Sequence, residues 1–200
     1  MPAYIALGTP WATAEVKNFM PANADGGTWG GKKFTYHPDA LSFDYKRDNS
    51  NGPEDATVVA YLWNGTWTQK DVPGNTSIVG TATKVDMVDR DRNVLGMPKT
   101  NAVLGGDVTS TEGATCVAKI NYAITGNTKK PLADGEEDKN EYEWVSDTID
   151  FDYGDNVDAK VEKINVIFSA TNYFGDRKYI VKNNSLSIDN VKLIYWHGLK

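Results

Sequence analysis

Hydrophobic and polar residues alternate along much of this chain with a period of two. Leu41, Phe43 and Tyr45, for example, are each followed by a polar residue. This period is typical of half-buried strands, whereas the apolar face of a helix recurs about every 3.6 residues. The same alternation predicts strands within residues 58–63, 116–124, 149–153, 164–169 and 186–195.

Turn-forming residues separate these segments, and helix signals are nearly absent. Asn64-Gly65 predicts a tight hairpin turn between Trp63 and Trp67, because both turn residues tolerate positive φ. One short helical turn is predicted over residues 14–20. We therefore predict an all-β fold, an antiparallel β-sandwich. Its core is predicted to contain Leu41, Phe43, Ile120, Val166, Phe168, Ile188 and Leu193.

Charge and composition exclude several classes of function. The 21 basic and 27 acidic residues give a formal net charge of −6, and no basic stripe is available for nucleic-acid phosphates. No apolar stretch approaches the roughly 18 residues of a membrane span. Cys116 is the only cysteine, which excludes an internal disulfide or a cysteine-based zinc cluster; we interpret it as a small buried hydrophobe.

The N-terminal residues carry neither the basic region nor the apolar segment of a signal peptide. The chain begins as if cut from a longer protein, with an export signal or another domain upstream. We expect residues 1–27 to form a strand or linker leading from that upstream region. Residues 28–200 are expected to form the sandwich domain.

Aromatic residues concentrate on one side of a predicted strand. Tyr61 and Trp63 lie opposite the aliphatic residues of that strand, and Trp67 follows across the predicted hairpin. In a sandwich this side faces solvent or a covering loop. Flat rings stack on the apolar face of a sugar, so we predict that Tyr61, Trp63 and Trp67 form a carbohydrate platform. The alternative is that these rings close the edge of a core, since Trp is highly buried on average.

Two polar segments supply candidate ligands for sugar hydroxyls. Residues 89–93 (DRDRN) combine Arg donors with Asp and Asn acceptors, and residues 172–177 (NYFGDR) have a similar composition. We select Arg90, Asp91 and Asn172 from them as ligand-binding residues. The alternative for both segments is a surface loop joined by local ion pairs, which contribute little when exposed.

The sequence contains no signature of catalysis or metal binding. Asp150, Asp152, Asp155 and Asp158 lie close together, but their spacing fails the EF-hand pattern, and a solvated strand edge is the simpler interpretation. There is no nucleophile elbow, zinc-protease motif, P-loop or dinucleotide fingerprint. With 27 carboxylates a hydrolytic pair is always available and never indicated, so we favour a non-catalytic protein.

Three segments have, in order, the pattern of a known family. Residues 28–46 (TWGGKKFTYHPDALSFDYK) contain a Gly-rich start followed by Pro-x-x-Leu-x-x-x-Tyr-Lys. Residues 55–58 (DATV) fit a central Asp-x-Ala-x-Val strand with one residue fewer before the Ala, and residues 184–195 (NSLSIDNVKLIY) fit a closing strand. Together they resemble the carbohydrate metabolism domain family, found in surface and lipoprotein-like proteins of glycan-degrading gut bacteria. The resemblance covers roughly residues 28–196.

The resemblance implies a jelly-roll sandwich akin to carbohydrate-binding modules, usually at the C-terminal end of a larger exported protein. The family has no settled catalytic residues to carry over. In many sugar-binding jelly rolls an Asp of the closing strand helps to hold a structural calcium ion, which would fall on Asp189. We favour an Asx turn at Asp189 and expect no cofactor, because a calcium site needs several further oxygens.

Three functions remain open. The leading hypothesis is a non-catalytic glycan-binding or accessory module of a surface polysaccharide-utilisation system, located outside the cell or on its surface. Its partners would be a carbohydrate and other domains of the same exported protein. The second hypothesis is a glycoside hydrolase or lyase with a paired-carboxylate cleft. The third is a structural or adhesin-type surface domain, which buried rings and an unpaired sheet edge would favour.

Overall fold

The computed structural model describes residues 3–17, 20–29, 31–65, 114–173 and 181–196. These residues contain no helix, and every pair of strands is antiparallel, which confirms the predicted all-β class. The strands are β1 (Tyr4–Ala6), β2 (Thr9–Lys17), β3 (Met20–Trp29), β4 (Lys32–Lys33), β5 (Ala40–Asp48), β6 (Ala56–Gly65), β7 (Ala114–Ile124), β8 (Val145–Asp150), β9 (Lys163–Ser169) and β10 (Ser185–Ile194).

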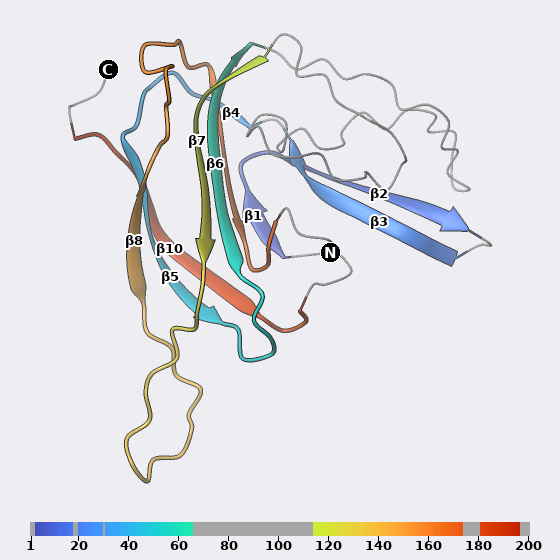
Figure 1. Cartoon of the computed structure of the whole chain (residues 1–200), viewed down its shortest axis with the longest axis vertical. Helices are drawn as coiled ribbons and strands as arrows, with labels where there is room; N and C mark the ends of the chain where they lie inside the picture. Colours follow the sequence, from blue (N-terminus) through green and yellow to red (C-terminus); the bar gives the residue numbers. More distant parts are fainter. Residues whose placement is uncertain (1–2, 18–19, 30, 66–113, 174–180, 197–200) are drawn as a thin grey trace.

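Two of the sheets face each other as a β-sandwich (Figure 1). The large sheet has the strand order β1-β9-β6-β7, with β4 also paired to β9, and the small sheet has the order β10-β5-β8. β2 and β3 form a separate hairpin that extends to one side of the sandwich. The connection between β7 and β8, residues 125–144, projects from one end of it.

The main hydrophobic core lies between the two sheets. Leu41 and Phe43 of β5 face residues of β6, β7 and β9, and the Phe43 and Phe168 rings meet edge-to-face with centroids 5.3 Å apart. Of the predicted core, Leu41, Phe43, Ile120, Val166 and Phe168 are buried, and Ile188 and Leu193 pack against them partly buried. The period-two alternation therefore identifies the inner faces of both sheets correctly.

The outer face of the large sheet is also buried in its middle. Val59, Tyr61 and Trp63 of β6 form a second apolar cluster with Ile167 of β9 and with Tyr173. Consequently β6 is buried on both faces from Ala56 to Trp63. A central strand with two buried faces has no solvent side, although its residues still alternate between one face and the other.

A β-bulge interrupts the pairing of β6 with β7. Leu62 pairs with Ala118 and Trp63 pairs with Cys116, so that Val117 is an extra residue in β7. The extra residue reverses the alternation: Val117 joins the core between the sheets, and Cys116 packs against the outer cluster with Trp63. A strict period of two within residues 116–124 predicts Cys116 on the same side as Ala118, and the bulge makes that prediction wrong.

Two local predictions near the ends of strands are also wrong. Of the segment predicted as a helical turn, residues 14–17 belong to β2 and Met20 begins β3. Cross-strand pairing satisfies the backbone there, whereas a one-turn helix has little stability of its own. Asn64 and Gly65 do not form a two-residue hairpin turn, because they pair with Thr115 and Ala114 of β7. Gly65 uses its positive φ of 80° at the end of β6 instead.

The N-terminal residues contribute to the sandwich. β1 pairs with the second half of β9 along Tyr4↔Ser169 to Ala6↔Ile167. The boundary expected between residues 27 and 28 falls inside β3.

Candidate functional site

Two of the three rings of the predicted platform, those of Tyr61 and Trp63, are not open to solvent. Tyr61 is 0% exposed and Trp63 is 1% exposed. Their ring centroids lie 5.2 Å apart, and the Asn165 side-chain amide donates a hydrogen bond to the Tyr61 hydroxyl at 2.9 Å. The rings do lie opposite the aliphatic set, as the alternation predicts, but that side is covered. A sugar therefore has no access to either ring in this structure, and the expectation of a solvent-facing platform is corrected.

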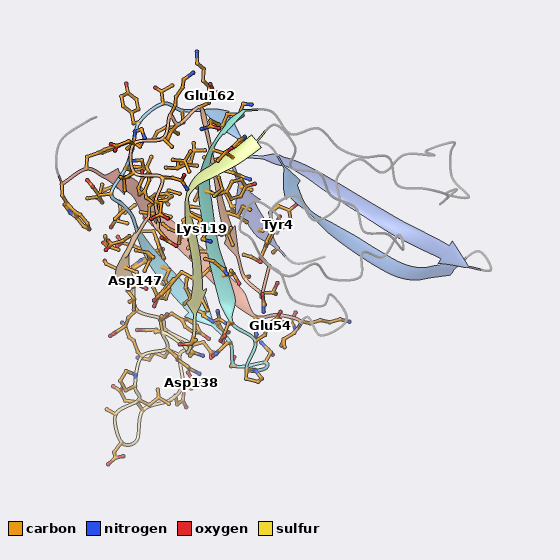
Figure 2. The ribbon with its side chains drawn as sticks, turned by 45° about the horizontal axis from the view of Figure 1, so that its top comes forward. Tyr4, Glu54, Lys119, Asp138, Asp147 and Glu162 are labelled. Atoms are coloured by element: carbon orange, nitrogen blue, oxygen red, sulfur yellow. The ribbon has the colours of Figure 1, made fainter. Side chains whose placement is uncertain are left out.

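The remaining predicted ligand residues are separated from this cluster or lie outside the described residues. Trp67, Arg90 and Asp91 fall outside them, so their grouping stays a prediction. Asn172 is exposed, and its backbone N–H donates to Glu54 Oε1 at 3.1 Å. Glu54 Oε2 accepts the backbone N–H of Val181 at 2.8 Å. The Glu54 carboxylate, labelled in Figure 2, thus holds the backbones of Asn172 and Val181 with one oxygen each.

The outer face of the small sheet presents a different set of side chains. Here polar residues from three strands line up in rows across the sheet, because the register pairs them directly. We call this surface the outer sheet face. Its rows are Ser187, Lys46 and Trp144; then Asp189, Asp44 and Ser146; then Lys192, Ser42 and Thr148, with Asn190 at the β10 bulge.

Hydrogen bonds link the middle of the outer sheet face. The Asp44 carboxylate accepts one bond from the Ser146 hydroxyl and one from the Asn190 amide, the latter at 2.6 Å. These two bonds, with the nearby Lys192 charge, lower the pKa of Asp44 below its usual value. The Thr148 hydroxyl donates to the Ser42 hydroxyl at 3.1 Å. The carboxylate is thus held ionised as an acceptor with a fixed direction.

One exposed ring lies at an end of the outer sheet face. Trp144 is 48% exposed and directly precedes β8. The Lys46 ammonium lies 4.9 Å from the centroid of its ring, in a cation–π contact. Sequence analysis did not select Trp144, although it continues the outward alternation of Ser146 and Thr148. That alternation was the signal that could have identified it.

A second group of rings lies beyond the other end of the small sheet. Tyr36 is 46% exposed, and its ring meets that of Tyr195 edge-to-face at 6.5 Å. Trp196 is 59% exposed, and its backbone N–H donates to Asp39 Oδ2 at 2.6 Å. Asp39 in turn donates its own N–H to the Ile194 carbonyl at 2.7 Å. The strand pairing of β5 with β10 therefore continues up to this aromatic group.

The carboxylates described by the structure do not form a metal-binding cluster. Within the described ranges no three or more His, Cys, Asp or Glu side chains are grouped as metal ligands. Asp152 bonds through its backbone to Lys119 and through Oδ1 to the Gly154 N–H. Asp189 Oδ1 accepts the adjacent Asn190 N–H at 2.7 Å. Hydrogen bonds lower the pKa values of Asp44 and Glu162, whereas a general acid needs a raised pKa.

Comparisons with protein-family models, curated proteins and solved structures find no match to this chain. Among the described residues there is also no helix with the length and hydropathy needed to cross a membrane.

Proposed function

We propose that this protein is a non-catalytic glycan-binding module whose ligand lies on the outer sheet face. The exposed ring of Trp144, beside rows of hydroxyl, amide, ammonium and carboxylate groups, is the observation that carries the proposal. Sugars present apolar C–H faces and many hydroxyls, so they need both a flat ring and paired donors and acceptors. The outer sheet face offers both on one rigid sheet.

The charges of this surface favour an uncharged ligand. Lys46 and Lys192 balance Asp44 and Asp189 within the same three rows. A ligand with many hydroxyls can donate to the two carboxylates and accept from the two ammonium groups. The carboxylates would repel a strongly anionic ligand, and the ammonium groups would repel a strongly cationic one.

The proposal includes the finer features that the family resemblance implies. The domain would be a jelly-roll sandwich of an exported, surface-associated protein from a glycan-degrading bacterium. The chain crosses from one sheet to the other between β5 and β6, between β7 and β8, between β8 and β9, and between β9 and β10, which supports a jelly-roll arrangement. Other domains of the same protein would be its partners, and no cofactor would be needed.

The two competing functions have less support on this surface. A hydrolase needs one protonated carboxyl group, and the central carboxylate here, Asp44, has a lowered pKa. A strand-pairing adhesin needs a regular free edge, but β10 has a bulge between Asp189 and Lys192, with Asn190 at a φ of 50°. Bulges of this kind oppose the addition of a further strand.

Glycan-array binding by the purified chain tests the proposal. We expect binding to neutral glycans with a Kd on the order of micromolar to millimolar. Trp144→Ala should weaken it, whereas Leu132→Ala should not, because Leu132 is an exposed apolar residue of the β7–β8 connection, which extends beyond the end of the sandwich, as the place of Asp138 in Figure 2 shows. Absence of binding to any glycan, or equal binding by both variants, would refute the proposal.

A further inference from the structure

The two exposed tryptophans of the small sheet stand at opposite ends of one surface. Trp144 lies beside Lys46 of β5, and Trp196 is bonded to Asp39 just before β5 begins. Trp196 follows the last residue of β10 by two residues, and its backbone stays beside the N-terminal end of β5 through the bond to Asp39. The outer sheet face lies between these two positions.

The length of this surface exceeds what one sugar ring can cover. Lys46 and Asp39 are seven residues apart along a chain that stays paired with both neighbouring strands. At about 3.3 Å per residue, that separation is about 23 Å. The rings also lie on opposite edges of the sheet, because Trp144 precedes β8 and Trp196 follows β10. A line between them therefore crosses all three strands.

Resting on the proposed function, we propose that the outer sheet face binds an internal stretch of a neutral polysaccharide, several sugar units long. The chain would run diagonally across the sheet, with Trp144 against one end of the bound stretch and Trp196 against the other. The polar rows between them would bind the hydroxyls of the intervening units.

The hydrogen bonds within the polar rows favour binding of an extended ligand along the surface rather than of a small ligand in a single deep site. Asp44 already has two donors, Ser146 and Asn190, and each oxygen keeps one further acceptor position for a sugar hydroxyl. Ser187, Asp189 and Lys192 are exposed and spread along β10. Each of these groups can make a weak contact, so affinity has to accumulate along the length of the ligand.

The test measures how affinity depends on chain length. The probes are cello-, xylo- and manno-oligosaccharides from the disaccharide to the hexasaccharide, together with mixed-linkage β-glucan, galactomannan and, as an acidic control, polygalacturonate. Isothermal titration calorimetry should show affinity in one neutral series rising at least about tenfold from disaccharide to hexasaccharide. Trp144→Ala and Trp196→Ala should each lower hexasaccharide affinity at least about fivefold.

Conservative and remote variants separate binding from folding. Trp144→Tyr and Trp196→Tyr retain a ring and should recover much of the affinity, while Ile5→Ala, an exposed apolar change on β1 of the other sheet, should have no effect. Affinity that is already maximal for the disaccharide, or that is insensitive to Trp196→Ala while sensitive to Trp144→Ala, would overturn the extended site and leave the proposed function intact. If none of these probes bound, the proposed function itself would be overturned. Preferential binding of polygalacturonate would overturn the neutral-ligand assignment.

Discussion

The same residue type has opposite roles at two positions of this sandwich. Trp63 is buried against Tyr61 and Gly31, whereas Trp144 is half exposed beside Lys46. Both rings follow the period-two alternation of their strands, and both lie on the outer face of their sheet. What differs is whether other parts of the chain cover that face. Burial therefore assigns Trp63 to stability and leaves Trp144 available for a ligand.

We expect Trp63→Ala to lower the free energy of unfolding by about 3–5 kcal/mol, because it leaves a large cavity in a fully buried cluster. Trp144→Ala is the matched control and should change it by no more than about 0.5 kcal/mol. Chemical denaturation followed by circular dichroism measures both. A small loss for Trp63→Ala would show that its ring faces solvent, as the sequence analysis first suggested.

The core between the sheets gives a second prediction at a single residue. Phe168 is buried and contacts the Phe43 ring at 5.3 Å between centroids. Phe168→Ala should cost about 3–5 kcal/mol of unfolding free energy, measured by urea denaturation. A loss below roughly 1 kcal/mol would mean that β9 is shifted by one residue, which would place Ile167 in this core instead.

Cys116 gives a chemical prediction. Burial raises the pKa of its thiol to about 11, so the reactive thiolate is scarce near neutral pH. We expect the folded protein to react with Ellman's reagent at pH 8 much more slowly than the urea-unfolded chain. The unfolded chain is the internal reference, since Cys116 is the only cysteine. Equal rates in the two states would contradict the burial of this side chain.

At the scale of strands, the period-two alternation predicted correctly which face of the sheet most side chains occupy, but it did not predict the β-bulges. It assigned β5, β6 and β9 correctly because β5 pairs with β8, and β6 with β9, without interruption through the core residues that it selected. It failed at Cys116 because a bulge depends on the partner strand, and neither strand's own sequence contains that information. The helical turn predicted within residues 14–20 failed for the same reason, because the pairing of β2 with β3 overrides weak local helix propensity.

Gly31 determines how closely β4 approaches β9. A Cβ atom at this position would overlap the Ile164 carbonyl oxygen and lie 2.7 Å from the Trp63 ring. Gly31→Ala should therefore destabilise the protein by about 1–3 kcal/mol, through overpacking against backbone that cannot move freely. Gly126→Ala is an informative comparison, because its Cβ would meet nothing within 4 Å and any loss would come from its positive φ alone. Thermal melts of both variants, analysed with the wild-type heat capacity, measure the difference.

At the scale of the molecule, the sequence could identify two sheets but could not tell which outer face is covered. Tyr61 and Trp63 were selected because aromatic rings on an outer face can bind sugars, and Trp144 was not selected. The burial of the first two depends on contacts with residues distant in sequence, such as Tyr173 and Gly31. Local sequence patterns do not predict such long-range contacts.

The two sheets are also joined by a buried charge. Arg47 of β5, in the small sheet, is 1% exposed, and its guanidinium donates to the carbonyl of Ile124, at the end of β7, at 2.6 Å, and to the carbonyl of Glu54, just before β6. Its backbone exchanges hydrogen bonds with Thr128, at the base of the projecting connection. Burial lowers the pKa of Arg47, but an arginine remains charged, so these carbonyl bonds compensate its desolvation.

Removing this link should weaken the whole sandwich. Arg47→Ala leaves two carbonyls without their donor and opens a cavity between the sheets, so we expect it to lower the unfolding free energy by roughly 2–5 kcal/mol. Arg47→Lys should lower the unfolding free energy by less, because its ammonium group can still donate to one of the two carbonyls, although it cannot span both as the planar guanidinium does. Lys46→Ala, one residue earlier and on the outer face, is the control and should stay within about 0.5 kcal/mol. Urea denaturation of the three variants measures these differences. If Arg47→Ala were as stable as Lys46→Ala, the guanidinium would contribute no net stability and hydrophobic contacts alone would hold the two sheets together.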